Sequence, residues 1–212
     1  MAYGMIAFAA LMWGMIGFFV KGLSQAGFDA MDIVAIRVGT AALMLIMIGL
    51  MFYRAYLKIQ LKDFPLFLGT GLMSIVFFNW CYFTAIEAMS IPVAAALLYT
   101  SPVFVITFSA LFLKERITRK KMIAVIGTVL GAAMVAGLTL NQGSIFPASS
   151  IFIGLGAGAG YALYSIFGKI ALRKYHPFTL TLYTFIVAAV FLVPSFLYTN
   201  DVVSDMNRNF LL

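Results

Sequence analysis

The sequence predicts an all-α integral membrane protein with seven transmembrane helices. Apolar residues make up 64% of the chain, and its mean hydropathy is +1.06. Only 10% of the residues are charged, whereas soluble domains carry about 25%. The apolar residues gather in runs long enough to cross a bilayer, which takes about 20 residues of helix. This composition excludes a soluble enzyme.

The apolar runs follow one another along the chain and are separated by short polar loops. The predicted spans lie at Tyr3–Val20, Met31–Tyr53, Phe64–Ile86, Pro92–Leu113, Met122–Leu140, Ile151–Gly168 and Phe178–Tyr198. The loops between them are too short for a globular domain, so we expect nearly the whole chain to lie in the membrane.

The fourth run carries the clearest orientation signal. It extends from Ile91 to Leu113 with a single proline, Pro102, at its middle, and it stops at a segment with five cations between positions 114 and 121. A proline inside a helix removes one backbone hydrogen bond. Carbonyls freed in this way are tolerated at membrane depth only beside protein or a water-filled cavity. The sequence therefore predicts that this helix faces the protein interior.

The loop cations are divided unequally between the two sides of the membrane. Eleven of them follow the second, fourth and sixth runs, on one side: Arg54, Lys58, Lys62, Lys114, Arg116, Arg119, Lys120, Lys121, Lys169, Arg173 and Lys174. The opposite loops hold only Lys21 and Arg208. Because positive loops resist translocation, we predict a multi-pass protein of the cytoplasmic membrane with its N-terminus in the cytoplasm.

This orientation argues against a seven-helix receptor or retinal protein, since both place the N-terminus outside. The last run also lacks the lysine that a retinal Schiff base needs. Every acidic residue lies at the end of a span or in a loop, so a paired-aspartate protease is excluded. One cysteine, Cys81, and one histidine, His176, cannot build a metal site. The loop cations form no stripe with interleaved aromatics. We expect no enzyme activity, no cofactor, no metal and no nucleic-acid partner.

An internal repeat relates the first run to the sixth. Trp13 precedes Lys21 by eight residues, as Tyr161 precedes Lys169, and further along Arg37 corresponds to Thr184. A unit with an odd number of spans re-enters the membrane upside down when it is repeated, which is the architecture of secondary transporters. We predict a first five-helix repeat at 1–140 and part of an inverted second repeat at 150–212, with three further spans after Leu212.

Several motifs resemble those of the drug/metabolite transporter superfamily, and specifically its EamA-like branch. The most specific is Pro102 followed by the turn Lys114-Glu115-Arg116-Ile117-Thr118. Others are Trp13-Gly14 with Lys21, Arg37, Phe83-Thr84-Ala85-Ile86, Ala94-Ala95-Ala96-Leu97-Leu98, and Gly127 with Gly137. The resemblance implies ten spans in two inverted repeats, both termini in the cytoplasm, and transport of small metabolites such as amino acids.

Polar and aromatic residues inside the spans are the candidates for a substrate cavity. Arg37 is the only cation within a span: it either snorkels to the surface or binds an anionic group such as a carboxylate. The tyrosines lie deeper than an interfacial belt, and a buried hydroxyl needs a partner. For each aromatic residue alone, ordinary packing is as good an interpretation. The predicted cavity residues are Trp13, Arg37, Asn79, Tyr82, Tyr99, Pro102, Tyr161, Tyr164 and Ser165.

Glycines at alternate positions from 154 to 160 form two overlapping small-xxx-small patterns, and Gly127 with Gly131 forms another, which favours close helix packing. The inverted repeat and the polar groups inside the spans predict a secondary transporter. The resemblance implies that it moves small metabolites, amino acids or related compounds, with export favoured over import. A membrane receptor or structural subunit without transport activity is the alternative. The expected partners are a small-molecule substrate and the lipid bilayer; the oligomeric state stays open.

Overall fold

The computed structural model describes residues 3–4, 7–8, 11–12, 15, 22–89, 91–135 and 146–199. Within these residues the chain forms helices and turns and no strand. The helices are α2 (Ala30–Phe52), α3 (Phe64–Leu68), the π-helix η3 (Gly69–Phe77), α4 (Phe78–Ala88), α5 (Ile91–Leu98), α6 (Ser101–Leu113), α7 (Arg119–Val135), α8 (Ala148–Ala171) and α9 (Pro177–Thr199). Two short 3-10 turns, η1 (Arg54–Tyr56) and η2 (Leu61–Asp63), connect α2 to α3.

Five described helical segments are long and apolar enough to cross a membrane: Ala30–Phe52, Leu61–Ala88, Ile91–Leu113, Ala148–Ala171 and Pro177–Tyr198. They coincide with the predicted second, third, fourth, sixth and seventh spans, which confirms an all-α membrane protein. α7 covers most of the predicted fifth span. The first span is described only in part, and its candidate residue Trp13 lies outside the described residues.

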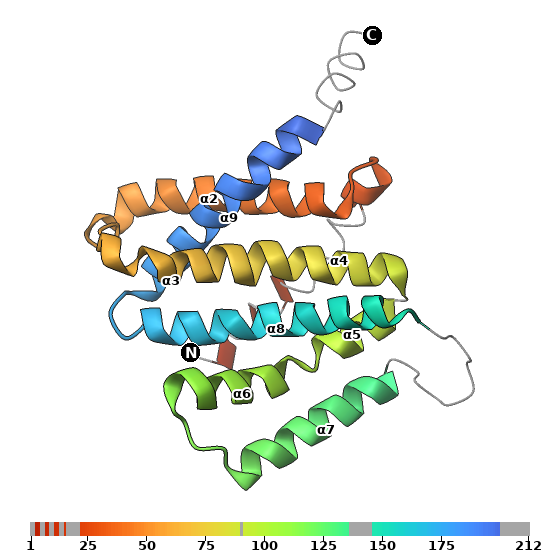
Figure 1. Cartoon of the computed structure of the whole chain (residues 1–212). Coiled ribbons are helices and arrows are strands. Elements are labelled where there is room, and N and C mark those ends of the chain that lie inside the picture. The colour runs from red at the N-terminus through yellow and green to blue at the C-terminus, as the bar shows by residue number, and fades with distance from the viewer. Residues whose placement is uncertain are drawn as a thin grey trace.

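The helices lie side by side in an order that differs from their order in the chain (Figure 1). α8 packs between the rod formed by α3, η3 and α4 on one side and α5 with α6 on the other. α9 crosses α2 obliquely and also contacts η3. The two helices from the end of the chain are therefore inserted among those that precede them.

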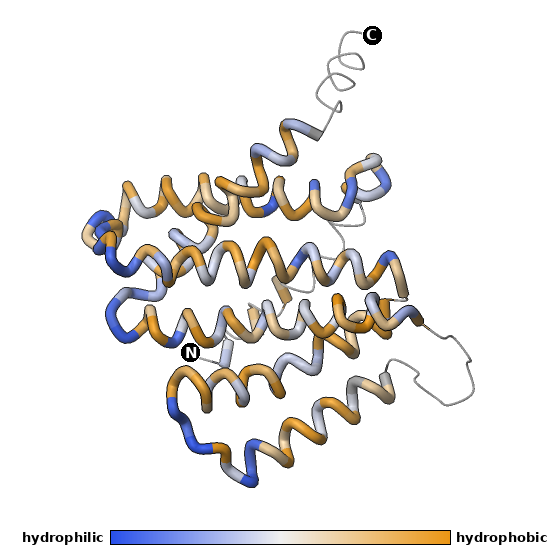
Figure 2. Tube along the Cα trace, viewed as in Figure 1, coloured by the Kyte–Doolittle hydropathy of each residue, from blue (hydrophilic) through white to orange (hydrophobic). Residues whose placement is uncertain are grey.

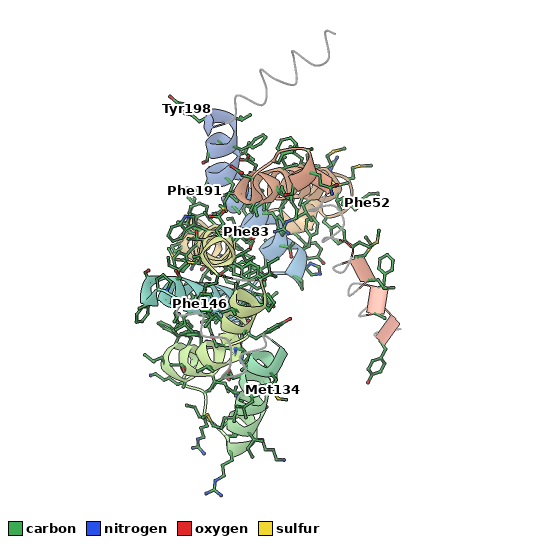
Figure 3. The ribbon with its side chains drawn as sticks, turned by 90° about the vertical axis from the view of Figure 1, so that its right-hand side faces the viewer. Phe52, Phe83, Met134, Phe146, Phe191 and Tyr198 are labelled. Atoms are coloured by element: carbon green, nitrogen blue, oxygen red, sulfur yellow. The ribbon has the colours of Figure 1, made fainter. Side chains whose placement is uncertain are left out.

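Apolar side chains cover the outside of this assembly, as expected for a surface that meets lipid. Figure 3 shows Phe52 and Tyr198 projecting outward, and they are 73% and 97% exposed. Phe83 instead lies between helices, against a buried cluster that includes Val34, Val38 and Ala188. The buried residues include many alanines as well as valines, leucines and Phe67, and the small ones let helices approach closely.

Hydrophilic segments gather at the helix ends, and the apolar residues lie along the helices (Figure 2). The loops at 53–63, 114–118 and 172–176 share one end of the molecule, which we call the cationic end. Ion pairs join these loops to one another and to α8, so their convergence does not depend on the view. The cations that we predicted to lie on one side of the membrane are in these three loops or within a few residues of them.

The alternating glycines of α8 are in close contact with two different helices, which confirms the packing prediction. A Cβ on Gly154 would lie 2.5 Å from Leu97 Cδ1, and one on Gly158 would lie 3.2 Å from the Leu97 carbonyl. Gly156 and Gly160 face the opposite neighbour, α4 with η3. The predicted pattern at 127 and 131 is different, because no described atom lies within 4 Å of a Cβ on either of these glycines.

The third span is not a uniform α-helix, a feature that we did not predict. Residues Gly69–Phe77 form a π-helix, in which the Ser74 hydroxyl donates to the Gly69 carbonyl at 3.2 Å. α9 lies directly on this segment. The buried Thr184 hydroxyl donates to the Thr70 hydroxyl at 2.7 Å, and Thr70 in turn donates to the Phe67 carbonyl.

The fourth span is broken, which corrects the prediction of one helix with a proline at its middle. α5 ends at Leu98 and α6 starts at Ser101, so Pro102 stands in the first turn of a new helix. There its missing N–H costs nothing, because the first amides of a helix have no partner within it. The Thr100 hydroxyl and N–H both donate to the Leu97 carbonyl, at 2.6 and 3.1 Å.

Candidate functional site

A hollow of about 300 Å³ lies beside the break in the fourth span, between α6, α7 and α8. α6 contributes Ser101, Pro102 and Ile106, α7 contributes Lys121, and α8 contributes Tyr161. We call it the break hollow. The structure thus brings together two predicted cavity residues, Pro102 and Tyr161, that are far apart in the sequence.

An aromatic cluster extends from this hollow along the third span. The Phe78 ring meets the Tyr161 ring edge to face at 5.8 Å and stacks on the Tyr82 ring at 5.8 Å. Tyr82 does not line the hollow itself, but it contacts Phe78, which in turn contacts Tyr161 at the hollow. We did not predict Phe78, although its position four residues before Tyr82 is a signal for an aromatic pair on one helical face. Tyr99, at the break itself, is 55% exposed.

A second hollow, of about 420 Å³, lies nearer the cationic end of α8. It is lined by two predicted cavity residues, Tyr164 and Ser165, and by Gly168, Lys169, Arg173 and Leu180. We call it the basic hollow. Its two cations were assigned only to topology from the sequence, yet they stand within reach of a solute that contacts Tyr164.

Two of the predicted polar residues lie elsewhere. The Asn79 side chain is 5% exposed, and its amide donates to the Ile75 carbonyl of its own helix at 2.7 Å. The Arg37 side chain is exposed on α2, and no ion pair in the described part of the chain includes it. No hydrogen bond joins these two side chains among the described residues.

Glu115 connects the rims of the two hollows, and sequence reasoning gave it no such role. Its carboxylate forms an ion pair with Lys121 of the break hollow at 3.3 Å and another with Lys169 of the basic hollow. Hydrogen bonds from Lys169 first, and then from Lys121, hold the pKa of the Glu115 carboxyl below its usual range. The carboxylate is therefore charged at neutral pH.

Comparison with known proteins identifies relatives along most of the chain. The model of the EamA-like transporter family matches residues 1–137 and 148–210. The chain is 30% identical over 184 residues to the pseudopaline exporter CntI of Pseudomonas aeruginosa strain PAO1, a match that covers 85% of this chain and 60% of that protein. No solved structure matches.

Two further relatives are uncharacterized transporters. One, from Archaeoglobus fulgidus, is 28% identical over 137 residues, which is 65% of this chain and 48% of that protein. The other, YyaM of Bacillus subtilis strain 168, is 26% identical over 178 residues, which is 81% of this chain and 57% of that protein. The chain thus aligns with about half to three fifths of the length of each of these relatives.

Proposed function

Because the chain belongs to the EamA-like transporter family, we propose that it is a secondary transporter that moves small metabolites, amino acids or related compounds, out across the cytoplasmic membrane. The observation that carries this proposal is the break in the fourth span beside the break hollow. Irregular backbone at membrane depth is tolerated only where it is buried in protein or lines a watery cavity. Transporters build their substrate sites from such interrupted helices.

The size and lining of the break hollow support a small amphipathic substrate. About 300 Å³ is at the lower end of the range for small-molecule pockets, which suits a solute of amino-acid size. The Tyr161 ring offers an apolar wall next to a hydroxyl, and Lys121 offers a cation for a carboxylate. The relative named as a pseudopaline exporter supports export as the direction.

Arg37 enters the proposal as a second group for an anionic part of the substrate, because it is a fixed charge inside a span with no counter-ion in the described part of the chain. We also include Trp13 and Asn79 in the proposed substrate site as residues of its wall. Asn79 is the weaker of these two, since its amide is already bonded within its helix.

The direct test is flux into proteoliposomes that contain the whole protein. We expect saturable counterflow of labelled amino acids that empty liposomes lack. Arg37→Met should lower this flux while membrane insertion persists, and Arg37→Lys should restore it only in part, because lysine keeps the charge without the planar fork. Equal flux for all three would remove Arg37 from the site. An absence of flux for every labelled metabolite would favour the receptor or structural alternative.

We further propose that the cationic end faces the cytoplasm and that 1–140 and 150–212 are inverted repeats. The separate family matches at 1–137 and 148–210 support the two units, and the distribution of loop cations supports the orientation. A reporter that is active only in the cytoplasm should work when fused after Lys120, and one active only outside should work after Gly143. Activities in the reverse order would overturn the orientation and the inverted repeat together.

A further inference from the structure

The hydrogen bonds that side chains make to distant parts of the sequence are concentrated at the cationic end. The buried bond between Thr184 and Thr70 lies away from this end. Seven others tie the loops at 53–63 and 114–118 to α8, α9 or the turn between them. These hydrogen bonds form two groups, which differ in the kinds of interaction that hold them together.

The first group fastens the loop before α3 to the start of α9. Asp63 accepts hydrogen bonds from Lys174 and from the Tyr175 hydroxyl. Neutral bonds reinforce it: the Thr179 hydroxyl donates to the Tyr56 carbonyl at 2.7 Å, and the Tyr183 hydroxyl donates to the Leu57 carbonyl at 2.6 Å. Aromatic stacking adds to these bonds, with the Tyr56 ring 4.2 Å from the His176 ring. This group does not depend on one charge.

The second group depends on one carboxylate. Glu115 is the only described residue of the 114–118 loop with a side chain bonded across to α8, and it makes this link through Lys169 alone. Its other partner, Lys121, belongs to α7. Both lysine side chains are about half exposed, at 45% and 51%. Ion pairs of this kind are screened by water and contribute little, so this link can be broken at small cost.

The backbone keeps Glu115 in position whether or not the pair is formed. Lys114 ends α6 in the left-handed conformation, with φ +54°, and the Glu115 N–H then donates to the Ser109 carbonyl at 3.2 Å. A cap of this type fixes the turn that follows a helix. The carboxylate is thus held at the end of α6 and can release Lys169 without unfolding the loop.

The position of this pair relative to the hollows suggests what its release does. Lys121 lines the break hollow and Lys169 lines the basic hollow, while Tyr161 and Tyr164 face these two hollows from successive turns of α8. α6 packs along α8, and α7 packs on α5 and α6. Separation of Glu115 from Lys169 removes the ion pair that holds the end of α6 next to α8, and so opens the contact between these two helices at the cationic end.

We propose that the Glu115–Lys169 pair is the gate of the transport pathway at the cationic end, and that the Asp63 group is a fixed hinge on the other side of α8. This inference rests on the proposed transport function. When the pair is formed, α6 and α7 are held against α8 and the break hollow is closed toward this end. When it parts, the hollow is open to the cationic side.

Cysteine accessibility tests the gate without any substrate. Cys81 is buried and can be replaced by alanine to give a cysteine-free background. Ser109→Cys then places a thiol of similar size on α6, at a buried position between Glu115 and the break hollow. The thiol is labelled from the cationic side with a membrane-impermeant maleimide, in vesicles whose orientation is known.

We expect Glu115→Gln to raise the labelling rate on the order of fivefold, the population shift that follows from losing one partly exposed ion pair. Lys169→Gln should do the same, and Glu115→Lys combined with Lys169→Glu should return the rate toward that of the parent. Glu87→Gln, at the opposite end, is the matched control and should leave the rate unchanged. Equal labelling of the parent, Glu115→Gln and Lys169→Gln would overturn the gate, whatever the flux assay shows. If the labelling rates follow the expected pattern but the parent protein shows no flux, the result would instead count against the proposed transport function.

Discussion

Gly71→Ala is expected to lower the free energy of unfolding by about 3 kcal/mol, as overpacking at a rigid contact does. A Cβ at this position would lie 2.6 Å from Val187 Cγ1 and 2.9 Å from the carbonyl oxygen of Thr184. Neither neighbour can move aside alone, since Val187 is branched at its own β-carbon and the Thr184 oxygen belongs to the backbone. α9 as a whole must move away from the π-helix, and the buried bond between Thr184 and Thr70 is then lost as well.

The matched control is Gly127→Ala, which is also a glycine-to-alanine change inside a helix. No described atom lies within 4 Å of a Cβ at Gly127, so only the better helix propensity of alanine acts, and stability should rise by up to about 1 kcal/mol. Unfolding in mixed detergent micelles, followed by circular dichroism, measures both variants. If Gly71→Ala is as stable as Gly127→Ala, α9 does not dock on the π-helix as described.

The positions of the spans follow from the sequence because burial in lipid requires long apolar helices, and the predicted runs agree with the observed ones to within a few residues. Irregularities inside the spans could not be predicted in the same way. Pro102 within an apolar run fits a kinked helix as well as the first turn of a new one. In the folded chain the Thr100 hydroxyl donates a hydrogen bond to the Leu97 carbonyl, and Gly158, which has no side chain, leaves room for the turn. Both are tertiary details that local sequence does not reveal.

Depth in the membrane was the signal from which the candidate cavity residues were predicted. Tyr161, Tyr164 and Ser165 are among these predicted residues, and all three line hollows. Asn79 shows the limit of that signal, since a polar group inside a span can be satisfied by its own helix.

Contacts between side chains that are far apart in the sequence could not be predicted from the sequence. Glu115 and Lys169 are 54 residues apart. Counting their charges predicts which side of the membrane they share, but it does not predict that they touch. Phe78 was missed for a related reason: its spacing from Tyr82 indicates a pair within one helix, but in a chain with 21 phenylalanines it does not show which of them meets Tyr161.

Tyr161→Ala is expected to reduce the transport efficiency, kcat/KM, by about tenfold to a hundredfold, the effect of losing about 1.5–3 kcal/mol of aromatic contact. Tyr161 is the wall of the break hollow on α8, and its ring meets Phe78 edge to face, so truncation removes both a surface for the substrate and the support of the neighbouring ring. Tyr161→Phe keeps the ring and removes only the hydroxyl. If that hydroxyl bonds the substrate, the phenylalanine variant should lose about twofold to tenfold, the range for a single hydrogen bond.

Tyr198→Ala is the control for a tyrosine outside the site, because this side chain is 97% exposed at the far end of α9, and its flux should equal that of the parent. All rates are counterflow rates in proteoliposomes, normalised to inserted protein. A loss for Tyr161→Ala that exceeds the loss for Tyr161→Phe places the ring itself in the pathway, because the two variants share the missing hydroxyl. Flux that is unchanged in Tyr161→Ala would remove the break hollow as the substrate site and leave the basic hollow, with Tyr164 and Ser165, as the place to test next.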